Sequence, residues 1–484
     1  WRRRRIIYNN DGDDALEARS GVEHEHDVAE SLMVRSSGDL VRDFLDARST
    51  PLIGSQVDSN WYASAMAGLT FSHHTKLGGF YGKEVPLELV EKYGRDTQKI
   101  QVDFSRKHGM EAAWCLRMND VHDAFPPGSR RWTYGIAPFK QDHPDCLMGE
   151  EDDWEKHGQH HPRGQWTRLD FAKPEVREHI FAIIEEVAES YDVELIGMEF
   201  FKYWPFFRES LEGAPVEPEH VETMNDLLRR IRRMADDVGS RRGRPLLLAA
   251  HTPFGLADCM HIGVDLETWL QEGLIDQFSP GGNMESVFRD SYTDIISLGH
   301  KYEIPVYPCI SWAPWGRWVF LASSEGKIRH YDKWLETLYG GQPERVDRPS
   351  FILTFNSWEG TPAAWRGAAS NLLNAGADGL YLFNPAFGEP QWWREIGETA
   401  TMAGKDKLYG IERFAGKDSF EALDERILAT DVPVAETFQV GEDPSTTNAS
   451  SVDFRLHLWD YVPGDDVSVR LNGESVDGMA PQDP

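Results

Sequence analysis

The segment Val193–Phe207, VELIGMEFFKYWPFF, decides the fold class of this chain. A short apolar run ends in Glu199, and Lys202 and Tyr203 follow it at once. Such a run is typical of a parallel strand that is buried on both faces. In a barrel of parallel strands, the carboxyl ends of the strands carry the functional groups. The segment therefore predicts a barrel strand ending in a functional carboxylate, beside aromatic and cationic groups that suit a sugar.

Similar apolar runs with polar ends recur along most of the chain. We expect strands at Arg5–Asn10, Pro51–Val57, Glu111–Arg117, Val193–Phe200, Pro245–His251, Leu274–Ser279, Ile304–Ser311 and Gly379–Asn384. Amphipathic patterns predict helices between them, at Pro174–Tyr191, His220–Val238 and Thr361–Asn374. This alternation is that of a (β/α)8 barrel, or TIM barrel. An open doubly wound sheet could share it, but no GxGxxG turn follows the first strand. A further strand-like run, Ser350–Phe355, either is an insertion or replaces one of these strands.

After about Lys405 the pattern changes to short alternating segments separated by Gly, Asp, Pro and Asn, such as Ala435–Val440, Val452–Leu458 and Asp466–Leu471. This pattern is typical of a small antiparallel sheet. We therefore expect a catalytic barrel over residues 1–404 and a β-sandwich-like domain over residues 405–484. The abrupt end of the sequence is consistent with a domain that continues past it. This domain would either bind carbohydrate or simply stabilise the barrel.

The chain is acidic, with 80 acidic against 50 basic side chains and a net charge of −30. Binding to nucleic acids or to membrane surfaces needs a basic footprint, so the composition argues against both. No apolar run reaches the length of a membrane span. The acidity suits a secreted or salt-adapted protein, and we expect a secreted or periplasmic location, without a visible signal peptide. Cys115 and Cys309 lie in apolar runs and no CxxC is present, so we expect buried thiols.

Cleavage of a glycosidic bond needs two carboxyl groups, one acid and one base or nucleophile. Glu199 is the first candidate for the acid. Its apolar neighbours Phe200, Phe201 and Trp204 should raise its pKa, although Lys202 acts in the opposite direction. The alternative is that Glu199 forms a structural salt bridge.

The partner carboxyl group is either Asp120, just past the third predicted strand, or Asp11, just past the first. For each of them, a hydrogen bond to the substrate is as compatible with the sequence as catalysis. Glu359 is a third candidate, although a role at a helix N-terminus explains it nearly as well.

Further polar and aromatic side chains at predicted strand ends are expected to bind the substrate: Asn9, Asp58, Trp61, Arg117, Asn119, His122, Lys202, His251, Trp312 and Asn384. With Trp315 and Trp318, Trp312 would form a stacking platform or anchor a loop. The histidines at 157, 160 and 161 lack the spacing of a zinc site. We therefore expect no metal ion and no cofactor.

Several of these motifs together resemble the glycoside-hydrolase-like family ten proteins, also called family 10 glycosylhydrolase-like proteins. The motifs are IIYNNDGDDA, LRMNDVHDAF, IGMEFFKYWPFF, FKQDHPDCLMG, VDLETWLQEGLIDQFSPGG and WRGAASNLLNAGADGLYLFNP. The resemblance implies a (β/α)8 barrel with a small C-terminal β domain and glycosidase activity on a polysaccharide. The family pattern carries Asp-Phe-Phe-Arg where this chain has Glu199-Phe200-Phe201-Lys202. The seventh predicted strand, VYPCISW, has no Glu, which argues against a simple retaining Glu–Glu mechanism.

The leading hypothesis is therefore a glycosidase that hydrolyses O-glycosidic bonds in a polysaccharide or a derived oligosaccharide. Two alternatives stay open. One is a barrel that binds carbohydrate without cleaving it, which the missing second Glu would explain. The other is a lyase acting on uronic-acid polymers, which would use His122 or His251 together with Arg117 and Lys202.

Overall fold

The computed structural model describes residues 2–12, 14–17, 37–81, 84–124, 136–157, 163–281, 291–311, 362–385, 392–409, 437, 439–443, 445–447, 449–454 and 468–476. The chain divides into two compact units, Trp1–Glu442 and Asp443–Pro484. The domain boundary expected near residue 404 stays a prediction.

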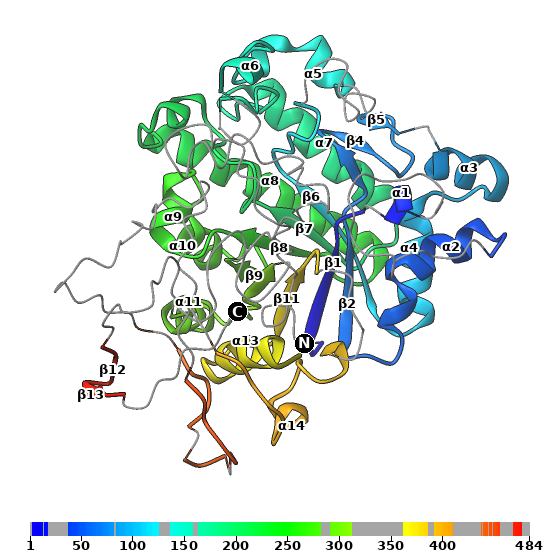
Figure 1. Ribbon diagram of the computed structural model, residues 1–484. Helices are drawn as coiled ribbons and strands as arrows, with labels where there is room; N and C mark the ends of the chain where they lie inside the picture. The colour runs from blue at the N-terminus through cyan, green and yellow to red at the C-terminus, as the bar shows by residue number, and fades with distance from the viewer. Residues whose placement is uncertain are drawn as a thin grey trace, which may run out of the picture. The chain divides into compact units, whose positions relative to one another are not determined.

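The first unit is built on one parallel sheet whose strands run in the order β10-β11-β1-β2-β6-β7-β8-β9 (Figure 1). The strands are β1 Ile6–Asn10, β2 Val57–Tyr62, β6 Glu111–Arg117, β7 Leu195–Glu199, β8 Leu247–Thr252, β9 Gln277–Pro280, β10 Cys309–Ser311 and β11 Leu380–Phe383. Phe278 of β9 donates to the carbonyl of Pro305 at 3.3 Å and accepts from Tyr307 at 3.0 Å, just before β10. These bonds bring the two edges together, so the sheet is a nearly closed barrel. The predicted eight-stranded parallel barrel is confirmed.

Helices alternate with the strands around the barrel: α2 Leu40–Arg48, α3 Glu84–Tyr93, α4 Thr97–Lys107, α7 Pro174–Ser190, α8 Pro218–Arg242, α9 Leu256–His261, α10 Leu266–Gln271, α11 Thr293–Lys301 and α13 Pro362–Asn374. The apolar face read from the sequence of α7 is buried, and Pro174 lies in its first turn, where a missing N–H costs nothing. The predicted helices α7, α8 and α13 are confirmed.

Shorter elements occupy the connections: α1 Asp14–Glu17, η2 Thr50–Leu52, α5 Pro138–Asp142, η4 Pro144–Cys146, α6 Asp153–His157, η5 Arg208–Glu212, η6 Trp392–Arg394 and α14 Thr399–Met402. After β2, a small sheet combines β3 Ala65–Ala67, β4 Thr70–Phe71 and β5 Gly79–Phe80.

The second predicted strand was placed wrongly. The segment expected to be strand, Pro51–Val57, contains η2, and β2 begins only at Val57. Polar residues inside β2 were therefore mistaken for the residues that follow a strand. Asn60 faces outward and donates a hydrogen bond to Ser105 Oγ of α4 at 3.0 Å. A polar side chain can therefore occupy the middle of this strand.

Apolar side chains and one buried ion pair fill the barrel interior. Trp61 lies there with no exposed surface, and Gly197 of β7 makes room for it, since a Cβ at this position would lie 2.5 Å from the indole. At the amino ends of the strands, Arg4 donates to both carboxylate oxygens of Glu111, at 2.8 and 2.6 Å. The interior is thus packed, and the predicted site lies at the opposite, carboxyl end of the barrel.

All four cysteines are buried thiols, as expected. Within the described residues, no helix is both long and apolar enough to cross a membrane. In the second unit, β12 Arg470–Leu471 and β13 Glu474–Ser475 pair antiparallel. A complete C-terminal sandwich stays a prediction, and the strand-like run Ser350–Phe355 lies outside the described residues.

Candidate active site

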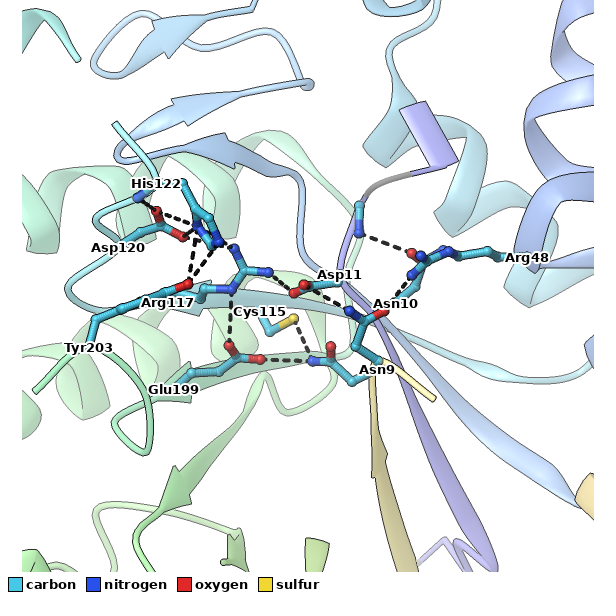
Figure 2. Close-up of polar contacts among 12 residues, drawn as sticks. Asn9, Asn10, Asp11, Arg48, Cys115, Arg117, Asp120, His122, Glu199 and Tyr203 are labelled. Carbon is cyan, nitrogen blue, oxygen red and sulfur yellow. Dashed lines mark hydrogen bonds and ion pairs between the residues drawn. The ribbon is translucent and has the colours of Figure 1, made fainter. Parts of the chain in front are cut away.

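Glu199 occupies the last position of β7, at the carboxyl end of the barrel. The sheet register pairs it with Arg117 of β6 on one side and His251 of β8 on the other. Paired residues of parallel strands point to the same face, so the three side chains share the barrel mouth. Asn9 of β1 completes the set by donating to Glu199 Oε1 at 2.8 Å, and Figure 2 shows this contact.

The environment of Glu199 favours its protonated form. The side chain has no exposed surface, and this burial raises the pKa of its carboxyl group. Arg117 and Lys202, together with the hydrogen bond from Asn9, act in the opposite direction but do not outweigh burial. The nearest guanidinium atom, Arg117 Nε, lies 3.8 Å from Oε2. Glu199 is therefore a candidate proton donor.

Arg117 links two further carboxylates at the barrel mouth. It forms ion pairs with Asp11 and, at 2.8 Å, with Asp120 Oδ2 (Figure 2). Burial alone would raise the pKa of Asp120, but His122 and Arg117 hold it well below its usual range. Asp120 Oδ1 also accepts from the backbone N–H of Gly68 at 2.9 Å. Asp120 is therefore ionised and fully bonded, which suits positioning of its neighbours and excludes a role as proton donor.

Asp11 is held on its other side by a second chain of contacts. Asn384 donates to Asp11 Oδ2 at 3.1 Å, and its own Oδ1 accepts from Arg48 of α2 at 2.6 Å. Both candidates for the partner carboxyl group, Asp11 and Asp120, are thus bound to Arg117. The structure brings them together with Glu199 and leaves their catalytic role as a prediction.

Tyr203 lies beside these side chains, although from the sequence it is only an aromatic neighbour of Glu199 and not one of the candidate site residues. Its hydroxyl lies 2.8 Å from His122 Nε2, and His122 Nδ1 lies 2.9 Å from Asp120 Oδ1. Burial lowers the pKa of His122, while Asp120 opposes this effect. The backbone of Tyr203 has a φ of 63°, in the left-handed region that a bulky residue rarely adopts. Lys202 places its ammonium 4.9 Å from the centre of the tyrosine ring.

His251 is enclosed rather than open to a substrate. Its ring stacks on Phe201, with centroids 3.7 Å apart, and its Nε2 lies 2.8 Å from the carbonyl oxygen of Gly281. Burial lowers the pKa of His251 to about 3, so the ring is neutral at ordinary pH. With Nε2 directed to a carbonyl, the hydrogen is on Nε2 and Nδ1 is an acceptor.

Three predicted substrate-binding residues have other contacts. Asp58 lies near the amino end of β2, where it accepts from Arg5 Nε at 2.9 Å, so its assignment to the barrel mouth was wrong. Asn119 accepts from the N–H of Leu169 at 2.8 Å and donates to the same residue's carbonyl at 3.1 Å. The Asn119 side chain therefore joins the loop after β6 to the segment around Leu169. A polar residue after a strand can thus stabilise a loop instead of binding a substrate.

Trp61 is also away from the mouth. It is buried in the barrel interior and donates from Nε1 to Ser59 Oγ at 2.9 Å. Its indole therefore packs inside the barrel and has no exposed face on which a sugar could stack. Its assignment failed for the same reason as that of Asp58, the misplaced second strand. Trp312, Trp315, Trp318 and Glu359 lie outside the described residues.

Several buried polar atoms at the mouth lack a hydrogen-bond partner among the described residues. They include Asn9 Oδ1, Glu199 Oε2 and His251 Nδ1. Buried polar atoms are nearly always paired in folded proteins, so these exceptions at the barrel mouth mark a candidate place for a polar ligand or water. Three possible metal ligands, His143, Asp145 and Cys146, meet elsewhere, in the connection after β6.

No protein-family model matches this chain, and no curated protein matches it. Among solved structures, it is similar to the glycoside hydrolase domain of PgaB (BpsB) from Bordetella bronchiseptica, with 10% identity over 82% of this chain and 99% of that one, and a TM-score of 0.43. It is also similar to alpha-L-fucosidase isoenzyme 2 from Paenibacillus thiaminolyticus, at 12% identity, with 82% of this chain and 48% of that one covered and a TM-score of 0.42. The chain thus spans about half the length of the fucosidase. These are distant matches to glycoside hydrolase barrels and assign neither a family nor an activity, and the resemblance to family ten stays a prediction.

Proposed function

We propose that this protein is a glycoside hydrolase in which Glu199 is the general acid. The observation that carries the proposal is the state of Glu199, a fully buried carboxyl group at a barrel strand end with a raised pKa, whose Oε2 has no hydrogen-bond partner among the described residues. A general acid must hold its proton near the working pH, and burial is how enzymes achieve this with Glu.

The surrounding groups support a carbohydrate as the substrate. Asn9 Oδ1 and His251 Nδ1 are acceptors without a partner among the described residues, and sugar hydroxyls are donors that would satisfy them. Lys202 and Tyr203 add a cation and an aromatic ring at the same end of the barrel. We therefore propose a polysaccharide or a derived oligosaccharide as the substrate, and a secreted or periplasmic location.

Kinetics of the Glu199→Gln variant test this assignment. Wild type and variant are incubated with neutral and acidic polysaccharides, and reducing ends are measured. Both are also given dinitrophenyl glycosides, whose leaving group departs without a proton. Loss of a general acid should lower polysaccharide turnover by about 10²–10⁴-fold and leave dinitrophenyl release nearly unchanged.

A matched control is Glu194→Gln, which changes a partly exposed carboxylate just before the amino end of the same strand. It should leave both reactions as in wild type. Full polysaccharide turnover by Glu199→Gln would contradict the proposal. Near-ultraviolet absorbance, followed in the same incubations, would reveal the unsaturated products of a lyase.

A non-catalytic carbohydrate-binding barrel is the second candidate function. The observation that favours it is that Asp11 and Asp120 both form ion pairs with Arg117. The ion pair makes each carboxylate a weaker base for activating water. Tight binding of one polysaccharide by wild type, with no product after long incubation, would support this candidate over hydrolysis.

A further inference from the structure

We propose that Tyr203, His122 and Asp120 form a proton relay in which the phenol oxygen of Tyr203 is the general base that acts together with Glu199. This inference rests on the proposed glycosidase function and supplies its missing second group. It assigns the role to a phenol and an imidazole in place of a carboxylate.

The hydrogen-bond geometry fixes the direction of the relay. His122 Nδ1 lies 2.9 and 3.0 Å from the two oxygens of Asp120, which is ionised and can only accept. These two contacts are shorter than the 3.3 Å contact with Arg117 Nη1, which would require Nδ1 to accept, so we assign the hydrogen of the neutral ring to Nδ1. His122 Nε2 is then an acceptor, so Tyr203 donates its hydroxyl hydrogen across the 2.8 Å contact. This is the orientation in which a phenol can pass a proton to an imidazole.

The charges that face the pair suit both ends of the transfer. Arg117 Nη1 lies 3.3 Å from His122 Nδ1, and Lys202 Nζ lies 4.9 Å from the centre of the Tyr203 ring. The two cations stabilise negative charge on the phenol oxygen. They oppose positive charge on the imidazole, and Asp120 compensates for this on the opposite side of the ring. The proton can therefore move without leaving an unbalanced charge.

The carboxylates are less suited to act as the base. Asp120 uses its oxygens on Arg117, His122 and the N–H of Gly68. Asp11 is ion-paired with Arg117 and accepts from an amide. The left-handed backbone of Tyr203 is a further sign of function, because such a conformation in a bulky residue persists where the surroundings require it.

The reaction balances without any further reagent. Water attacks the anomeric carbon and gives its proton to the Tyr203 oxygen, while the phenol proton moves to His122 Nε2. The bond between the anomeric carbon and the leaving oxygen breaks, and that oxygen takes the proton of Glu199. One C–O bond forms and one breaks. The imidazolium proton of His122 returns through solvent to the Glu199 carboxylate, which restores the resting state.

The first test needs no substrate. Nitrogen-15 NMR of histidine-labelled protein reports which ring nitrogen of His122 carries hydrogen, with the signal assigned by its loss in His122→Gln. We expect the Nδ1–H form, and a shift of the Nε2 resonance in Tyr203→Phe. An Nε2–H form, or an unchanged resonance in Tyr203→Phe, would overturn the relay whether or not the protein is active.

The second test uses the dinitrophenyl glycosides, because their cleavage bypasses the general acid but still needs the base. Tyr203→Phe should lower kcat by about 10²–10⁴-fold and change KM little. The control Tyr302→Phe removes a hydroxyl that bonds an acid elsewhere, Glu267 on α10, and should match wild type. If Tyr203→Phe retains the wild-type kcat, the relay is overturned. If the wild-type protein cleaves none of the substrates, the glycosidase function itself is contradicted.

Discussion

Replacing Arg117 with methionine is expected to destabilise the fold strongly. The Arg117 side chain is 3% exposed, and its partners Asp11 and Asp120 are 7% and 0% exposed. The substitution removes the cation from two buried carboxylates and leaves both of them in place. Breaking a buried ion pair from one side costs about 3–5 kcal/mol, since the remaining charge stays desolvated. We expect a loss in the free energy of unfolding within that range at neutral pH.

The loss should depend on pH in a defined direction. In wild type the pKa of Asp120 is depressed, so its ionised form stabilises the fold above the unfolded-state pKa. This contribution is lost as the pH falls through the depressed folded-state pKa. Arg117→Met removes one cause of the lowered pKa of Asp120. The stability that ionised Asp120 contributes therefore decreases mainly near neutral pH. The difference between wild type and variant should therefore be largest near neutrality and smaller in acid.

Urea unfolding followed by tryptophan fluorescence measures this difference at each pH. The control is Arg229→Met, because Arg229 also contacts three carboxylates but lies at the surface. Its side chain is 24% exposed, and those of its partners are 37–68% exposed. Exposed ion pairs contribute about 0–1 kcal/mol each, so the control should lose much less. Equal losses in the two variants would refute the argument from burial.

Three further predictions follow from the same geometry. The value of kcat/KM should fall in acid as His122, whose pKa is below its usual 6.5, becomes protonated. It should fall in alkali as Glu199, whose pKa is above its usual 4.5, ionises. An alkaline fall that persists in Glu199→Gln would contradict this assignment. Gly197→Val should lower the free energy of unfolding by about 1–3 kcal/mol in a thermal melt, because its Cβ would collide with Trp61, and an unchanged melt would show that the interior can adjust. Asp58→Asn should keep wild-type kcat, since Asp58 lies at the opposite end of the barrel, and a large fall in kcat would return it to the site.

The sequence allowed the barrel to be predicted because most of its strands are continuous apolar runs. β6 has the bounds that were predicted, Glu111–Arg117, and all of its residues are buried. Glu199 was identified for the same reason, as a carboxylate that ends such a run. β2 was misplaced because its sequence, VDSNWY, mixes polar and apolar residues that are satisfied on opposite faces. Apolar-run reasoning has no means to detect a strand of that kind.

The pairing of charges could not be predicted, since it joins residues far apart in the chain. Asp11 and Arg117 are far apart in the sequence. Their ion pair arises only when the barrel brings the carboxyl ends of β1 and β6, with β2 between them, to the same mouth. The contact of Tyr203 with His122 was missed for a local reason, although Tyr203 itself was noted as an aromatic neighbour of Glu199. An alternating or helical pattern says nothing about a residue whose left-handed backbone turns its ring toward His122.

The buried ionic clusters at the two ends of the barrel differ in how completely they are hydrogen-bonded, and this difference supports the proposal that the carboxyl-end cluster is the site. At the amino end, Glu111 accepts from Arg4 on both oxygens and from Ser59 at 2.5 Å, so its carboxylate is fully bonded. At the carboxyl end, Glu199 Oε2 and Asn9 Oδ1 are buried with no hydrogen-bond partner in the described part of the chain. A cluster that only stabilised the fold would gain by pairing these atoms, because leaving them unpaired costs free energy. The buried atoms without a hydrogen-bond partner beside Glu199 therefore support the proposal that a substrate supplies the missing hydrogen bonds at this end.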